Sequence, residues 1–145
     1  MQSPELLKQL AEVDRLALED RLQRVWENRL FGDWPALLAL LDPEIRVTSP
    51  GARGLAPRGP PFSGADAVVE RARRVYVQFE CLGSEVHALL IDGDRAVIQI
   101  LAHLRDRGSG ELSDWNVIDF VRFRDGLVTE LVEYSDPDHG GPDRF

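Results

Sequence analysis

Cysteine is nearly absent from this chain of 145 residues, which contains Cys81 and no other. A single cysteine excludes an intrachain disulfide and any metal site built from several cysteines. A domain of this length needs neither, because it buries roughly 70% of the surface that its unfolded form exposes. We therefore expect one domain closed by an ordinary hydrophobic core.

A basic excess and a long apolar run are also missing. The 17 Lys and Arg residues face 25 Asp and Glu, so the net charge of -8 argues against a nucleic-acid partner. The longest apolar stretch, residues 34–41, is far shorter than the roughly 20 residues that cross a bilayer. The first residues lack the basic and apolar segments of a secretory signal. These absences predict a cytoplasmic protein with no membrane partner.

What the sequence does contain is helical periodicity in its first half. Ser3 before Pro4 is typical of a helix start, and apolar residues recur at helical spacing up to Gly32. A short second helix is predicted from Asp33 to about residue 41 and a third from residue 63 or 64 to about 78.

Period-two alternation dominates the second half. A short strand at 45–48 precedes four longer ones at 84–91, 95–105, 112–124 and 127–135, separated by glycine-containing turns. This order predicts an α+β fold in which a curved antiparallel meander, covered on one face by about three N-terminal helices, forms a cone with an internal pocket. We assign residues 1–136 to this single domain and residues 137–145 to a flexible C-terminal tail.

Strand parity predicts which side chains share the pocket. A three-residue loop at 108–110 would set His103 opposite Trp115 and Gln99 opposite Asp119, whereas a two-residue loop would reverse the whole set. A three-residue loop at 124–126 would place Glu133 on the same face. That face would then hold Asp119 in an apolar frame, where desolvation raises the pKa of a carboxyl group and makes it a proton donor or a base near neutral pH. A purely structural hydrogen bond to Asp119 is the alternative.

Several short motifs resemble one protein family. They are Gly32-Asp33, the strand and loop at 45–50, Phe62-Ser63-Gly64, residues 117–123 followed by Asp125-Gly126, and Glu133-Tyr134. Together they resemble the nuclear-transport-factor-2-like superfamily over residues 16–136, with its SnoaL-like polyketide cyclase and ketosteroid isomerase branches nearest. The fold hosts isomerases, cyclases, dehydratases, epoxide hydrolases and binders without catalysis, so the resemblance does not select a reaction.

The resemblance can be carried over only position by position. Asp119 falls where ketosteroid isomerases hold a protonated aspartic acid, but Ser49 stands where their general base would be. His103 and Asp119 fit the histidine and aspartate that SnoaL-like cyclases carry on neighbouring strands. In the limonene epoxide hydrolase branch only the last carboxylate has a counterpart, Glu133.

We therefore expect a cofactor-independent cyclase or isomerase that acts on a small apolar carbonyl compound, with Asp119 and His103 as catalytic residues. The alternatives are a non-catalytic ligand-binding domain and an epoxide-hydrolase-like activity. No trio of His, Asp or Glu has ligand-like spacing, so no metal is expected. The residues expected to bind the ligand are Gln99, Trp115, Val117, Glu133, Leu131, Trp26 and Ser49.

The other sheet face is predicted to be apolar enough to need a cover, which suggests a homodimer formed through it. The residues assigned to that face are Asn116, Ile118, Phe120 and Arg122, with Ile98, Ile100 and Leu104.

Overall fold

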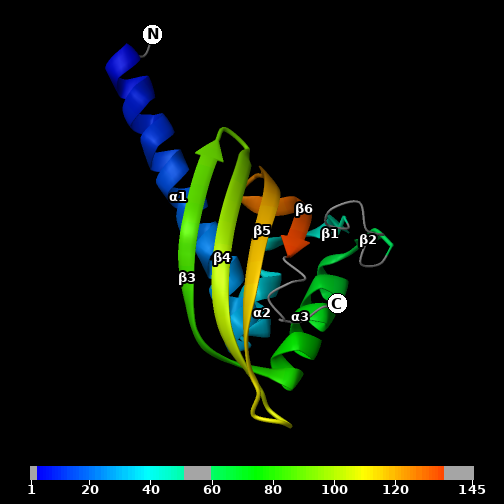
Figure 1. The fold of residues 1–145 in the computed structure, drawn as a ribbon. Coiled ribbons are helices and arrows are strands. Elements are labelled where there is room, and N and C mark those ends of the chain that lie inside the picture. Colours follow the sequence, from blue (N-terminus) through cyan, green and yellow to red (C-terminus); the bar gives the residue numbers. More distant parts are fainter. Residues whose placement is uncertain (1–2, 51–59, 136–145) are drawn as a thin grey trace.

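The computed structural model describes residues 3–50 and 60–135 (Figure 1). The tail expected at 137–145 lies outside the described residues. The helices are α1 (Pro4–Phe31), α2 (Trp34–Leu38) and α3 (Ala65–Gln78). The strands are β1 (Leu41–Thr48), β2 (Phe62–Ser63), β3 (Phe79–Asp92), β4 (Arg95–Asp106), β5 (Leu112–Arg124) and β6 (Leu127–Ser135).

Helix α1 begins and ends at the residues that the sequence predicts. The Ser3 hydroxyl accepts a hydrogen bond from the Leu6 amide, and Gly32 closes the helix in the left-handed conformation with φ of 81°. Glycine is required at this end, since a Cβ on Gly32 would lie 2.9 Å from the Tyr76 ring. Only the second half of α1 packs on the sheet, and the first half projects beyond it (Figure 1).

The strands form one curved sheet in the order β2-β1-β6-β5-β4-β3. The four-strand meander β3–β6 is antiparallel as predicted, whereas β1 pairs in parallel with β6 and makes the sheet mixed. The helices cover one face, here called the inner face, and leave the outer face open (Figure 1). The α+β class and the one-sided helical cover are confirmed. No helix in the described ranges is long and apolar enough to cross a membrane.

The register of β4 against β5 differs from the prediction. His103 pairs with Asp114 and Ile98 pairs with Asp119, because the loop between the strands has four residues, 107–110. The Asp106 carboxylate sets this loop by accepting hydrogen bonds from the amides of Gly108 and Ser109, at 2.8 and 3.1 Å. One extra loop residue turns every β4 side chain to the opposite face. The assignment of Ile98, Ile100 and Leu104 to the outer face was therefore wrong, since all three are buried in the core.

The hairpin between β5 and β6 also differs from the prediction in its turn, but its side chains point to the predicted faces of the sheet. Asp125 and Gly126 form a two-residue turn with positive φ at both positions, and a bulge lies between Arg122 and Phe123. Together these shift the register by two residues, which preserves parity. Glu133 therefore stands directly opposite Asp119 on the inner face.

Candidate active site

Two carboxyl groups face each other at the centre of the inner face. Asp119 on β5 and Glu133 on β6 are neighbours in the sheet and are 1% and 4% exposed. The indole N–H of Trp26, on α1, donates to Asp119 Oδ2 at 2.9 Å. No N–H or O–H group of the described residues donates to Asp119 Oδ1. The position of Asp119 as a buried, apolar-framed carboxyl is thus the one that strand parity predicts.

Arg29 joins the two carboxyl groups from the helical side. Its guanidinium donates to Glu133 Oε1 at 3.0 Å and lies 3.5 Å from Asp119 Oδ2. It also stacks 4.1 Å above the Trp26 ring, which packs edge-on against Trp115 at 5.3 Å. Arg29, Asp119, Glu133 and Trp26 are called the buried polar cluster below.

Sequence reasoning overlooked Arg29, although a signal was present. Arg29 follows Leu22 and Trp26 at intervals of seven and three residues, which places its side chain on the buried stripe of α1. An arginine on such a stripe needs a buried carboxylate, and Glu133 lies 104 residues further along the chain.

Burial and charge decide the protonation of the cluster. Burial, with the charge of Glu133 and a hydrogen bond to it, raises the pKa of Asp119 well above its usual range, against the opposing effects of Arg29 and the Trp26 N–H. For Arg29, burial alone would lower the pKa, but Glu133 and Asp119 outweigh it and raise the pKa. The raised pKa favours the neutral form of Asp119, whereas Glu133 pairs directly with the Arg29 guanidinium.

A small cavity of about 20 Å³ adjoins the cluster, with room for about one water molecule. Arg29 and Glu133 line it and Asp119 does not, so Glu133 is the carboxyl group that a ligand there would meet. Of the predicted ligand-binding residues, Ser49 and Leu131 also line the cavity, whereas Trp26, Trp115 and Val117 lie buried in the core. Its full lining is Arg29, Val47, Ser49, Phe62, Val68, Arg71, Ala72, Leu131 and Glu133.

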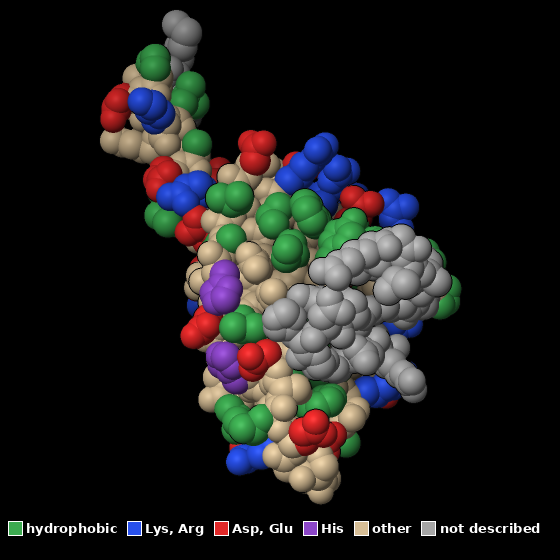
Figure 2. All heavy atoms as spheres, in the orientation of Figure 1, with side chains coloured by type: hydrophobic (Ala, Val, Ile, Leu, Met, Phe, Trp, Pro, Cys, Tyr) green, Lys and Arg blue, Asp and Glu red, His purple; other side chains and the backbone are tan. Residues whose placement is uncertain are grey.

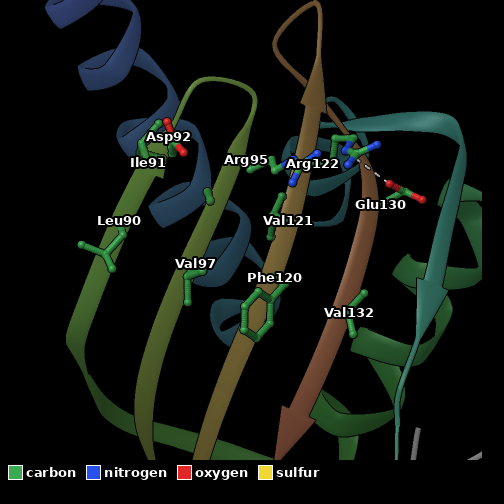
Figure 3. A pocket seen from close by; sticks show the side chains of 11 residues that line it. Leu90, Ile91, Asp92, Arg95, Val97, Phe120, Val121, Arg122, Glu130 and Val132 are labelled. Carbon is green, nitrogen blue, oxygen red and sulfur yellow. Dashed lines mark ion pairs between the residues drawn. The ribbon is translucent and has the colours of Figure 1, made fainter.

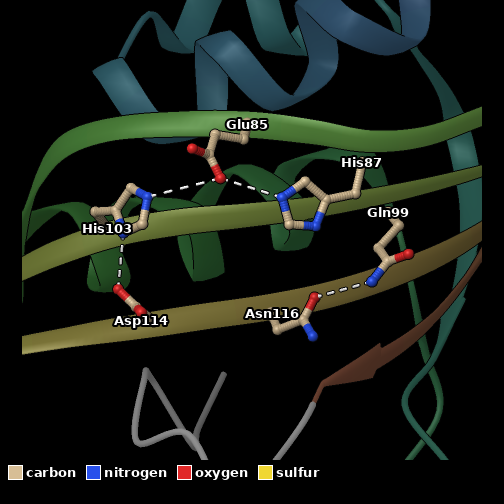
Figure 4. A network of polar contacts seen from close by, with 6 residues as sticks. All are labelled: Glu85, His87, Gln99, His103, Asp114 and Asn116. Carbon is tan, nitrogen blue, oxygen red and sulfur yellow. Dashed lines mark hydrogen bonds and ion pairs between the residues drawn. The ribbon is translucent and has the colours of Figure 1, made fainter.

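His103 and Gln99 lie on the outer face, across the sheet from Asp119 (Figure 4). The His103 ring contacts Asp114 at 2.8 Å through Nδ1 and Glu85 at 3.9 Å through Nε2. The Gln99 side-chain amide donates to Asn116 at 3.4 Å. The predicted convergence of His103, Gln99 and Asp119 was therefore wrong, because the four-residue loop reverses the facing of β4.

The described residues contain no group of three His, Cys, Asp or Glu side chains placed to hold a metal ion. In the buried polar cluster, the guanidinium of Arg29 occupies the position beside the two carboxyl groups.

The sequence profile of the SnoaL-like domain family matches residues 21–131. The matched segment includes Trp26, Arg29 and Asp119 and ends two residues before Glu133. No curated protein matches this chain in sequence.

Three solved structures are similar in fold. An LEH-like epoxide hydrolase from M. tuberculosis superimposes with a TM-score of 0.67 over 86% of both chains, at 14% identity. A protein assigned as a polyketide cyclase from Xanthomonas campestris pv. campestris gives 0.66 over 86% of this chain and 93% of that one, at 20% identity. A Catenulispora acidiphila protein with a ketosteroid isomerase-like fold, in complex with trimethylamine, gives 0.67 over 85% and 94%, at 13% identity. Identities this low establish a shared fold and leave the reaction open.

Proposed function

This chain belongs to the SnoaL-like domain family, and from that premise we propose that it is a small-molecule enzyme performing acid/base chemistry on an apolar carbonyl compound. The reaction takes place between the sheet and the helices. The observation that carries the proposal is the buried pair of Asp119 and Glu133, in which only Glu133 borders a cavity. Asp119, the direct sheet neighbour of Glu133, has its pKa raised by burial, and groups with perturbed pKa values are typical of catalytic sites.

In the proposed reaction, the Glu133 carboxylate removes a proton from the carbon next to the substrate carbonyl. The electron pair of that C–H bond moves to the carbonyl oxygen and forms an enolate, which the Arg29 guanidinium stabilises from the same cavity wall. Neutral Asp119, held by the Trp26 N–H, keeps Glu133 in place as a positioning residue. Where a C=C double bond is conjugated with the enolate, return of the proton from Glu133 to the far carbon of that bond gives an isomer. Where the substrate carries a second carbonyl, attack of the enolate carbon on it forms the C–C bond of a ring, and Glu133 returns its proton to the resulting alkoxide oxygen.

Deuterium exchange tests the proposal without knowledge of the substrate. Wild-type protein should catalyse exchange of the α-protons of small ketones such as cyclohexanone in heavy water, followed by NMR. Glu133→Gln should lower the rate by about 100-fold or more, since general-base catalysis contributes about that much. Glu130→Gln is the matched control, because Glu130 lies on the same strand but pairs with exposed Arg46 on the other face. Equal rates in the two variants would refute the role of Glu133.

The size of the cavity favours a second candidate function. Space for about one water molecule beside Glu133 suits activation of water, as in an epoxide-hydrolase-like reaction. Three results together would favour this reaction. Wild-type protein would hydrolyse a small epoxide such as styrene oxide, Glu133→Gln would lose that activity, and wild-type protein would show no ketone exchange. Absence of both activities would favour the non-catalytic ligand-binding domain.

We further propose that a second copy of this chain covers the outer face of the sheet. Hydrophobic side chains gather on the upper part of this face (Figure 2) and line a hollow of about 430 Å³ (Figure 3). Phe120 at its centre is 48% exposed and Leu90 is 67% exposed. The rim carries two acidic and two basic residues, of which Arg122 and Glu130 pair within one chain at 3.5 Å, so a twofold axis can pair Asp92 of one copy with Arg95 of the other. The rim residues are Asp92, Arg95, Arg122 and Glu130.

Sedimentation equilibrium tests this assembly. We expect a dimer at micromolar concentration that Phe120→Arg converts to a monomer. Phe31→Arg is the control, because Phe31 is 59% exposed at the end of α1 and lies outside this hollow. A wild-type monomer at that concentration would rule the dimer out.

A further inference from the structure

The cavity beside Glu133 has a second arginine on its wall. Arg71, on α3, lies on the same lining as Glu133 and Arg29. Its guanidinium stacks 3.8 Å above the Phe62 ring. Among the described residues, no carboxylate lies within ion-pair distance of Arg71, although the chain as a whole carries a net charge of -8. Arg71 is therefore a cation on the cavity wall that can pair with an anionic group of a ligand.

Charge accounting shows what this cation leaves open. Arg29 pairs with Glu133 at 3.0 Å, whereas no acidic side chain in the described lining of the cavity pairs with Arg71. Burial lowers the pKa of Arg71, and the neighbouring Arg74 adds to the shift. An anion next to Arg71 would relieve both effects.

Arg71 also stands at the less buried end of the cavity. The cavity wall is buried on the side of Arg29, Glu133 and Leu131, whereas Ser49, Phe62 and Arg71 are only half-buried. The polar groups are thus ordered from Arg71 outside to Glu133 inside.

We propose that the substrate is a short oxo-carboxylate whose carboxylate is bound by Arg71 and whose carbonyl carbon chain reaches Glu133. A guanidinium suits this role because its planar fork matches two carboxylate oxygens and remains stacked on an aromatic ring. The small cavity favours a chain of few carbons between the two groups. The reaction of the substrate carbonyl at Glu133 rests on the proposed function. The binding of the substrate carboxylate depends on Arg71 alone.

The experiment compares the binding of levulinate with that of levulinamide, its uncharged counterpart, by titration calorimetry. Wild-type protein should bind levulinate about tenfold or more tightly, as expected for a charge-assisted hydrogen bond. Arg71→Gln should remove the preference, and Arg71→Lys should retain part of it. Arg74→Gln is the matched control, since it removes the same charge from the same helix at a side chain that is 66% exposed and pairs with Glu70. Arg74→Gln should leave the preference unchanged.

Three results would overturn the inference: equal affinities of wild-type protein for the two compounds, no binding of either at millimolar concentration, or equal losses in Arg71→Gln and Arg74→Gln. Thermal melts of each variant establish that it is folded. Binding is measured here without turnover, so a preference for levulinate in a protein with no exchange activity would refute the proposed function and support the role of Arg71. Exchange activity without a preference for levulinate would support the proposed function and refute the role of Arg71.

Discussion

The two faces of the sheet carry two polar networks built from similar side chains in opposite surroundings. On the inner face, Arg29, Asp119 and Glu133 are each at most 8% exposed. On the outer face, Glu85, His103 and Asp114 have side chains between 41% and 57% exposed. The shortest polar contacts are similar in length, 3.0 Å between Arg29 and Glu133 and 2.8 Å between His103 and Asp114. The spacing is therefore the same, and burial is what separates them.

The difference decides what each network can do. On the outer face, water solvates each charge whether or not its partner is present, so the ion pairs contribute little. On the inner face, removal of one partner leaves a charge without solvent, which costs several kcal/mol. The same burial raises the pKa of Asp119, and carboxyl groups shifted in this way are typical of sites of acid/base chemistry.

The largest expected effect comes from a substitution that breaks the polar network of the inner face. Arg29→Met removes the guanidinium between the two buried carboxyl groups and should lower the free energy of unfolding by about 3–5 kcal/mol. Arg46→Met removes an arginine from an equally short pair, in which Arg46 lies 2.9 Å from Glu130. The Arg46 side chain is 74% exposed. This substitution should cost less than about 1 kcal/mol. Urea unfolding measures both, and similar losses in the two variants would contradict the distinction between the faces.

A smaller effect concerns the proton on Asp119. Because the folded state holds this proton after the unfolded state has released it, stability should fall as pH rises from about 3.9 toward the raised pKa, by up to about 1.4 kcal/mol per pH unit. Asp119→Asn mimics the neutral carboxyl, so the variant should lack this decline. Asp114→Asn on the outer face should retain it. Parallel pH profiles for wild-type protein and Asp119→Asn would show that Asp119 is ionised in the fold.

The smallest effect belongs to the histidine that the sequence places in the pocket. His103→Gln should change the free energy of unfolding by less than about 1 kcal/mol, because its side chain is 41% exposed and its partners stay solvated. It should also leave ketone exchange unchanged, since the sheet separates it from Glu133. A loss of exchange comparable to that of Glu133→Gln would show that His103 takes part in the reaction.

Sequence reasoning succeeded where the signal is local. The ends of α1 follow from Ser3 and Gly32, and the strands of the meander follow from alternation between glycine turns. The facing of Asp119 and Glu133 was also predictable, because each depends on parity within its own strand and on a hairpin whose errors cancel. These features need few contacts between distant residues.

The failures involve information that no short segment contains. The sequence from Asp106 to Gly110 is compatible with loops of several lengths, and only the hydrogen bonds of the Asp106 carboxylate select four residues. A one-residue difference there moved His103 and Gln99 to the other face. Arg29 was missed because its role depends on an ion pair with Glu133, a carboxylate on the last strand.

Helix α1 is one continuous helix of 28 residues, about 42 Å long, that passes through two environments. Residues 3–14 are exposed throughout, whereas Leu22 to Leu30 contribute five buried side chains. A helix without packing is marginally stable in water, so amide hydrogens in the first turns should exchange with solvent far faster than those around Trp26. The cooperative folding unit thus begins partway along α1, and one regular element belongs to two regions of different thermodynamic stability.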